Sequence, residues 1–363
     1  MFSTQIEEQV TKRIVQIIAS FWILMKMMSI KLWVKERNYP VVPVIDLPAA
    51  MHIVLLGLFF VLAAWLIWKP DNRKAMTALI VTEIITTLAD QNRLQPWHYQ
   101  YVFTFFALAA NGKKTGKALQ AIALICVATY LFSGLQKLHS GFINSVWSVH
   151  ILKNFMRLPD HIIHNRFVHA AGYIIPAIEI GGSLGLLYHK TMKAAAYSLI
   201  GMHIFLLWFL GPLGINYNTV VWPWNVQMVM LLHLLFIRNK ILLNGSLFAS
   251  AANIIVAFFW LVMPVFGLFG YWDKFLSSAM YAGKTRLKQY YFEDRATIPA
   301  ELKKYAFYSK TNASARIVIT DWSVQELNVA AVTEPRMLRS ITRQLNERYA
   351  SQKLKFEVTE ADY

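Results

Sequence analysis

The stretch PAAMHIVLLGLFFVLAAWLIW at residues 48–68 decides the fold class. It contains no Lys, Arg, Asp or Glu, and a helix of about 20 mostly apolar residues crosses the roughly 30 Å hydrocarbon core of a bilayer. Further apolar stretches lie on both sides of it, at 14–34, 75–90, 97–111, 118–137, 167–187, 194–211, 220–237 and 248–271. Residues 1–274 therefore predict an all-α polytopic transmembrane bundle with about nine spans.

The overall composition supports this class. Of the 363 residues, 56% are hydrophobic and only 15% are charged, whereas soluble domains average about 25% charged residues. The formal net charge of +16 raises the question of a nucleic-acid partner. Because Lys and Arg lie mainly in short loops between apolar stretches, we interpret the excess as a signal for orientation in a lipid bilayer, with no nucleic acid involved.

Basic residues follow every second predicted span. By the positive-inside rule, the loops that carry them face the cytoplasm. The N-terminus is then also cytoplasmic, and the C-terminal part lies outside the cell membrane. Its compact size favours a bacterial inner membrane. The basic loops contain Lys69, Arg73 and Lys74, then Lys113, Lys114 and Lys117, then His189, Lys190 and Lys193, and finally Arg238 and Lys240.

Residues 275–363 differ in composition from the rest of the chain. They are mixed polar, with 14 Lys/Arg and 10 Asp/Glu. Residues 316–320 read as a strand, and residues 337–349 have the apolar spacing of an amphipathic helix. We expect a small extracytoplasmic α+β domain, which is a candidate docking site for a peptide or a protein partner.

Several ionisable side chains fall inside the predicted spans. Glu83, Glu179 and His203 lie within apolar stretches, and Lys137 ends the fifth. Each such group costs about 2.5–3.5 kcal/mol on insertion scales, so it either has a function or has a partner in the bundle. Pairing of Glu83 and Glu179 with Lys26, with arginines or with backbone donors is the structural alternative.

Two polar stretches interrupt the apolar pattern. Residues 90–99 (DQNRLQPWHY) and 216–225 (NYNTVVWPWN) are rich in hydrogen-bonding and aromatic side chains. Polar groups at membrane depth are tolerated where they line a cavity or are buried in protein. Since both stretches fall on the predicted outer side, we expect one outward-facing pocket. His161, His164 and His169 lack acidic or Cys partners, so no metal site is predicted.

The stretch YLFSGLQKL at 130–138 resembles the motif around the catalytic lysine of vitamin K-dependent gamma-carboxylases, which bacterial horizontally transferred transmembrane domain proteins share. The motif is an aromatic-rich helix followed by Gly, two residues, Lys and Leu. Residues 90–101 resemble a polar family segment with an early Asp, a central His and spaced tyrosines, although His98 comes one position late. His203 resembles a further family histidine, and the resemblance covers most of residues 10–275 in layout.

The resemblance implies that Lys137 is the catalytic base and that His98 and His203 take part. The substrate would be a reduced naphthoquinone, menaquinol or vitamin K hydroquinone, oxidised to an epoxide with or without carboxylation of a glutamyl peptide. The large C-terminal region of the animal enzymes is missing, so propeptide binding is not expected. The candidate substrate- or cofactor-binding residues are Asp90, Arg93, Gln95, Trp97, Tyr99, Tyr130, Asn216, Asn218, Trp222, Trp224 and Asn225.

Two other classes remain open. One is a non-enzymatic quinone- or lipid-binding subunit of a larger complex, resembling DoxX-like membrane proteins and docking through residues 275–363. The other is a transporter, which ranks last because the sequence has no visible repeat symmetry and no cross-membrane relay of charges. An enzyme needs a reactive lysine in a closed pocket, whereas a binding subunit needs only an apolar cleft.

Overall fold

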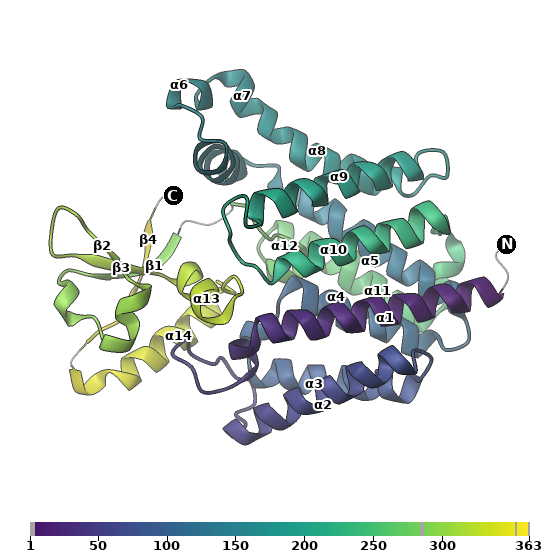
Figure 1. Cartoon of the computed structure of the whole chain (residues 1–363), viewed down its shortest axis with the longest axis horizontal. Coiled ribbons are helices and arrows are strands. Elements are labelled where there is room, and N and C mark those ends of the chain that lie inside the picture. The colour runs from purple at the N-terminus through teal and green to yellow at the C-terminus, as the bar shows by residue number, and fades with distance from the viewer. Residues whose placement is uncertain (1–3, 284–286, 353, 362–363) are drawn as a thin grey trace.

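The computed structural model describes residues 4–283, 287–352 and 354–361. Helices run lengthwise through the molecule, and a small sheet domain lies at one end (Figure 1). Helix is present in each of the nine apolar stretches. The main segments are α1 (Thr4–Met28), α2 (Ala49–Trp68), α3 (Arg73–Ala89), α4 (Pro96–Asn111), α5 (Thr115–Lys137), α7 (Arg166–Ala170), α8 (Ile174–Gly185), α9 (Met192–Leu210), α10 (Val221–Leu232), α11 (Ala251–Ala257) and α12 (Met263–Leu268).

Within the described residues, five helical segments are long and apolar enough to cross a membrane. They are Ala49–Trp68, Thr115–Lys137, Arg166–Gly185, Met192–Leu210 and Ala251–Leu268. These segments support integration in a membrane, but the prediction of nine spans is not confirmed. The helices α3 and α4 have only 17 and 16 residues, and α1 carries ionisable residues that face protein.

The helix α5 is the central element of the bundle. In its apolar window 72% of residues are buried, compared with 28% for α2. The outward side chains of α2 are apolar, as on a lipid-facing surface, and include Val54, Val61 and Trp65. Small residues let α8 approach α5 closely, and the Ser183 hydroxyl donates to the Val127 carbonyl at 2.9 Å. The functional side chains of α5 therefore face protein.

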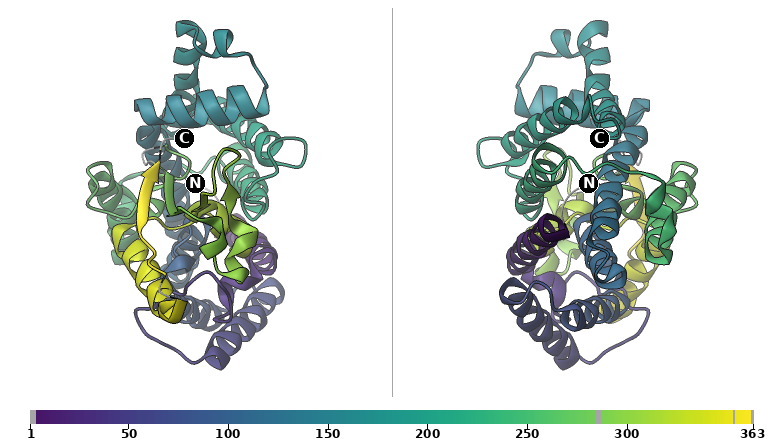
Figure 2. Two further views of the ribbon diagram at one scale, coloured as in Figure 1. Left: turned by 90° about the vertical axis from the view of Figure 1, so that its left-hand side faces the viewer. Right: turned by 90° about the vertical axis from the view of Figure 1, so that its right-hand side faces the viewer.

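The connection between α5 and α7 contains a long helix of its own. The structure forms a helix over Phe142–Phe155, with π-type hydrogen bonding, followed by the short α6 (Asp160–Ile163). Figures 1 and 2 show the first of these helices crossing the bundle axis at a steep angle. That is the orientation of a helix that lies in the plane of a membrane.

The predicted small α+β C-terminal domain is confirmed. An antiparallel sheet in the order β2-β3-β1-β4 joins β1 (Leu287–Phe292), β2 (Phe307–Tyr308), β3 (Ala315–Val318) and β4 (Val358–Ala361). The predicted strand at 316–320 ends at Val318, where α13 (Ile319–Leu327) begins. The predicted amphipathic helix is α14 (Pro335–Arg348), and it buries Met337, Leu338, Ile341 and Leu345.

This domain docks on the loops at one end of the bundle. The Glu326 carboxylate accepts from the backbone nitrogens of Asn38 and Tyr39 at 2.7 and 3.1 Å. The Gln95 amide donates to the Ala330 carbonyl at 3.1 Å. The basic loops and the N-terminus lie at the opposite end (Figure 1). The basic loops and the N-terminus therefore share one end of the bundle, and the C-terminal domain lies at the other.

Candidate active site

A cavity of about 500 Å³ lies between α5, α8, α9, α10 and the C-terminal domain. Its walls are mostly apolar and aromatic, and the segment Ala330–Glu334 of the C-terminal domain contributes to them. The polar side chains of the wall include Tyr130, Ser133, Lys137, Glu179, His203 and Asn225 from the bundle, and Lys274, Lys288 and Asp321 on the side of the C-terminal domain. Ligand sites in proteins typically measure about 300–1,000 Å³ and combine an apolar lining with a few polar groups.

Lys137 lies on this wall beside Ser133, one helical turn earlier on the same face of α5. Its Nζ contacts both carboxylate oxygens of Glu179 at 2.8 Å and the Ser133 Oγ at 2.5 Å. The two charged side chains are only 9% and 5% exposed. The three ammonium hydrogens are thus matched by three acceptors. Lys137 is therefore a member of an ion pair with Glu179 and not an isolated amine on the cavity wall.

The contact between α5 and α8 brings the pair together. A Cβ added at Gly134 would lie 2.6 Å from Ile180 Cγ1 and 2.9 Å from the Pro176 carbonyl oxygen. Both distances are too short for carbon and oxygen atoms, so only glycine permits this approach. Glu179 lies on the same segment of α8, and its Cβ would be 3.1 Å from the added atom.

Gly134→Ala is therefore expected to push α8 away from α5 and to lower the free energy of unfolding by about 1–3 kcal/mol. Thermal unfolding of the purified protein in detergent measures this loss. Gly181→Ala is the matched control, because a Cβ there meets nothing within 4 Å and alanine favours helix. Equal melting temperatures of the two variants would contradict the close-packing argument.

A second polar group on the wall is a chain of three side chains. The Tyr130 hydroxyl lies 2.6 Å from His203 Nε2, and His203 Nδ1 lies 2.7 Å from Asn225 Oδ1. The chain connects α5, α9 and α10 across the cavity wall. The structure thus brings together Lys137, His203, Tyr130 and Asn225 from the predicted site.

The other aromatic and amide candidates divide between the cavity and its surroundings. Tyr99 and Trp224 line it, and the Trp224 indole donates to Gln100 Oε1 at 2.7 Å. Trp222 and Asn216 do not line it, and the Trp222 indole donates to the Leu210 carbonyl at 2.9 Å. Asn218 lies just behind the wall, where its amide donates to the hydroxyl of Tyr281 at 2.7 Å.

Apart from Tyr99, the candidates from the first polar stretch are buried outside the cavity, beside α1, α3 and α4. The ring of His98 lies 3.5 Å from Glu83, and its Nε2 lies 3.1 Å from the Thr87 hydroxyl. Glu83 is paired with Lys26, with both contacts below 3 Å, which is the structural alternative considered for this residue. The structure therefore does not bring His98 or Trp97 to the cavity.

Asp90 and Arg93 hold the outer loops together. The Asp90 carboxylate accepts from Arg37 at 2.5 Å and from the Val42 backbone nitrogen at 3.0 Å. Arg93 donates to the carbonyls of Leu32 and Thr86 at 3.0 and 2.8 Å. These contacts, with that of Gln95 to the C-terminal domain, satisfy most of this polar stretch within the protein. Only Pro96 and Tyr99 of it reach the cavity, which Tyr217, Val221, Trp224 and Asn225 of the second stretch also line.

Other residues at the cavity were not among the sequence candidates. Glu179, Ser133 and Gln100 were missed, and so was the outer rim with Lys274 and Asp321. Burial lowers the pKa of the Lys274 ammonium and raises the pKa of the Asp321 carboxyl. The sequence signal for Glu179 was its position deep in an apolar stretch, but nothing local indicated which cation it meets.

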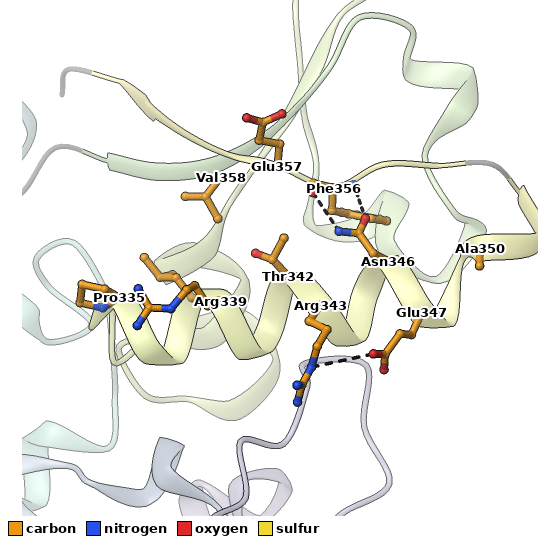
Figure 3. Close-up of a pocket in the computed structure, with 11 residues that line it drawn as sticks. Pro335, Arg339, Thr342, Arg343, Asn346, Glu347, Ala350, Phe356, Glu357 and Val358 are labelled. Atoms are coloured by element: carbon orange, nitrogen blue, oxygen red, sulfur yellow. Dashed lines mark hydrogen bonds and ion pairs between the residues drawn. The ribbon is translucent and has the colours of Figure 1, made fainter.

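A second hollow lies on the C-terminal domain, between α14 and β4 (Figure 3). It measures about 790 Å³ but is open to the surface and contains no predicted site residue. Asn346 of α14 forms two hydrogen bonds with the segment that leads into β4. Its Oδ1 accepts from the Phe356 backbone nitrogen at 2.6 Å, and its Nδ2 donates to the Phe356 carbonyl at 3.2 Å. In Figure 3, Arg343 and Glu347 point away from the strand. The enclosed cavity is therefore the better candidate for a ligand.

Among the described residues, no group of three or more His, Cys, Asp or Glu side chains is arranged to hold a metal ion. Comparison of the chain with protein-family models, with curated proteins and with solved structures gave no significant match. The family resemblance thus rests on the residues quoted for it in the sequence, and its functional content is a proposal.

Proposed function

We propose that this protein is a membrane enzyme that binds a reduced naphthoquinone in the cavity and removes a proton from it, in gamma-carboxylase-like or epoxidase chemistry. The observation that carries the proposal is the buried Lys137–Glu179 pair on the wall of an otherwise apolar cavity. Its spatial neighbours Tyr130 and His203 belong to the same predicted site.

The cavity fits such a ligand in size and in chemistry. About 500 Å³ falls in the range of small-molecule sites. Aromatic walls such as Tyr99, Trp224 and Phe209 suit a flat apolar ring, and the helices α5, α8, α9 and α10 contribute buried polar groups to the same wall. A ligand dissolved in the bilayer would reach this space between helices.

The ion pair can accept one proton without leaving an isolated charge. The Glu179 carboxylate has two oxygens, which accept from Lys137 and from the Ser133 hydroxyl at 3.0 Å. Glu179 takes the proton of a ligand hydroxyl, and the Lys137 ammonium then faces the negative charge left on the ligand oxygen. A bound quinol supplies the electrons for the reduction of O2, in the overall conversion of quinol and O2 into quinone epoxide and water.

The chemistry is tested with purified protein in lipid nanodiscs. Incubation with menaquinol or vitamin K hydroquinone and O2 is expected to give the epoxide faster than protein-free nanodiscs do, as measured by liquid chromatography. Omission of O2 is the control and should abolish the product. Protein that neither binds nor oxidises the quinol would overturn the proposal.

The second candidate is a non-enzymatic quinone- or lipid-binding subunit. The observation that favours it is the saturation of the Lys137 ammonium by its three acceptors, because a neutralised pair can serve binding alone. Quinol binding without epoxide formation would support this candidate. The C-terminal domain would then be the docking element for a peptide or a protein partner.

The orientation belongs to the same proposal. The end of the bundle with the basic loops faces the cytoplasm, as does the N-terminus, in a bacterial inner membrane. The cavity and the C-terminal domain then lie towards the outer face. Protease protection of a C-terminal tag in sealed inverted vesicles, with cleavage in spheroplasts, is the result that this orientation requires.

A further inference from the structure

The hydrogen-bonded chain of Tyr130, His203 and Asn225 on the cavity wall begins at a backbone carbonyl. The Asn225 Nδ2 donates to the Val221 carbonyl at 2.7 Å, and Asn225 Oδ1 faces His203 Nδ1 at 2.7 Å. A carbonyl only accepts, so the amide nitrogen of Asn225 must be the atom that points to Val221. The amide oxygen is then fixed on the side of His203, and the network itself sets the orientation of the amide.

This orientation determines where His203 carries its proton. Since Asn225 Oδ1 only accepts, His203 Nδ1 must carry the hydrogen. The ring is 6% exposed, and both of its hydrogen-bond partners, Tyr130 and Asn225, are neutral side chains. A charged ring without a counter-charge is costly inside a membrane protein. The ring is therefore neutral, and Nε2 is a bare acceptor.

The acceptor at Nε2 fixes the hydroxyl of Tyr130 in turn. Tyr130 lies 2.6 Å from this nitrogen and must donate its one hydrogen to it. The phenol oxygen has no hydrogen left for a ligand, but it keeps lone pairs. Tyr130 is part of the cavity wall, so at this point the wall offers only an acceptor.

The Lys137–Glu179 ion pair likewise offers a ligand a hydrogen-bond acceptor and no donor. The Ser133 hydroxyl donates to Glu179 at 3.0 Å, and Lys137 directs its hydrogens to Glu179 and Ser133. The group with unused hydrogen-bonding capacity is the Glu179 carboxylate, which is an acceptor. Tyr130, Ser133 and Lys137 share one face of α5, and this face thus presents acceptors on both of its polar groups.

We infer that the wall formed by α5 and α8 selects ligands by hydrogen-bond polarity. Where a ring oxygen meets Tyr130 or Glu179, a hydroxyl that donates is favoured and an oxygen that only accepts is disfavoured, while the donor Lys274 lies at the outer rim of the cavity. The inference rests on the proposed function and gives it a direction, since a hydroquinone carries two hydroxyl donors and a quinone none. Tyr130 is the specificity-determining residue, and His203 and Asn225 are positioning residues that set its polarity. An oxidised product is then released, because its carbonyl oxygens face the lone pairs of the wall and no hydrogen lies between them.

The test compares ligands of one shape under anaerobic conditions. Menadiol, menadione and menadiol dimethyl ether are titrated calorimetrically into the full-length protein in nanodiscs. The wild-type protein is expected to bind menadiol about tenfold more tightly than either compound without a hydroxyl donor. Equal affinities, or no menadiol binding, would overturn the inference.

Two variants separate polarity from shape. Tyr130→Phe removes the acceptor and should reduce the preference for menadiol to about one- to threefold. Asn225→Leu leaves Tyr130 in place but removes the acceptor that holds the hydrogen on His203 Nδ1. His203 Nε2 can then carry the hydrogen and donate to Tyr130, so the preference for menadiol over menadione should again decrease. Tyr101→Phe is the matched control, because this buried tyrosine donates to Gln227 at 3.3 Å and does not line the cavity. An unchanged preference in Tyr130→Phe would refute the role of the phenol.

This readout is independent of catalysis. A preference for menadiol without epoxide formation would leave the polarity inference intact and remove the enzymatic proposal. Epoxide formation by a protein that binds menadiol and menadione equally would do the reverse. The two measurements therefore fail separately.

Discussion

Replacement of Glu83 by alanine is expected to lower the free energy of unfolding by about 3–5 kcal/mol, because it leaves a buried ammonium without its counter-charge. The Lys26 Nζ lies 2.8 and 2.7 Å from the two oxygens of Glu83, and the side chains are 1% and 0% exposed. The rings of Trp33 and Phe59 lie 3.7 and 3.8 Å from the same nitrogen. Aromatic faces attract a cation, but they do not replace a carboxylate.

Thermal unfolding and the yield of monodisperse protein in detergent measure this effect. The control is Lys12→Ala, which breaks the exposed contact of Lys12 with Asp71 at 3.6 Å and should change stability by at most about 1 kcal/mol. The double replacement Lys26→Met with Glu83→Leu removes both charges together. It should recover most of the lost stability, and a Glu83→Ala protein as stable as the wild type would contradict the argument.

Lys137→Met and Glu179→Leu are each expected to lower the rate of quinol oxidation by about 10²–10⁴-fold, the usual contribution of a positioned acid or base. Without Lys137 the buried carboxylate takes up a proton and can no longer accept one. Without Glu179 the site lacks the carboxylate that accepts the proton of the ligand hydroxyl. The rate of epoxide formation at saturating quinol measures both losses.

The double variant Lys137→Met with Glu179→Leu distinguishes catalysis from folding. Each single variant leaves a buried charge unpaired and should unfold at a lower temperature, whereas the double variant regains stability. Its activity should stay lost. Lys153→Ala, which removes the exposed partner of Asp160 at 3.0 Å, should leave both properties unchanged. A double variant with normal turnover would rule out the pair as the base.

The predicted helices follow from local properties of the chain. A stretch such as 48–68 can satisfy its backbone in lipid only as a helix, and its side chains need no partner. The same holds for the amphipathic pattern of α14, whose apolar residues Met337, Ile341 and Leu345 recur at helical spacing and are buried. A strand was also predicted at 316–320, but in the structure the strand ends at Val318. Ile319 is the first residue of α13 and is buried in the core.

The site was predicted in part. Lys137, Tyr130, His203 and Asn225 line one cavity, whereas His98 and Arg93 are buried elsewhere with partners of their own. Both polar stretches are rich in amide and aromatic side chains, and composition does not reveal which neighbours satisfy a polar group. For that reason Glu83 and Glu179 looked alike in the sequence, although one belongs to a closed cluster and the other to a cavity wall.

The sequence by itself determined that residues 1–274 form apolar helices, that a small mixed domain follows them, and that the loop charges differ between the two ends. These properties depend on hydropathy and periodicity within one segment. Only the tertiary structure decided that Lys137 pairs with Glu179, 42 positions later in the chain, and that Ala330–Glu334 forms part of the cavity wall. Such contacts depend on how helices pack, because a buried charge is stable only beside the particular partner that the fold brings to it.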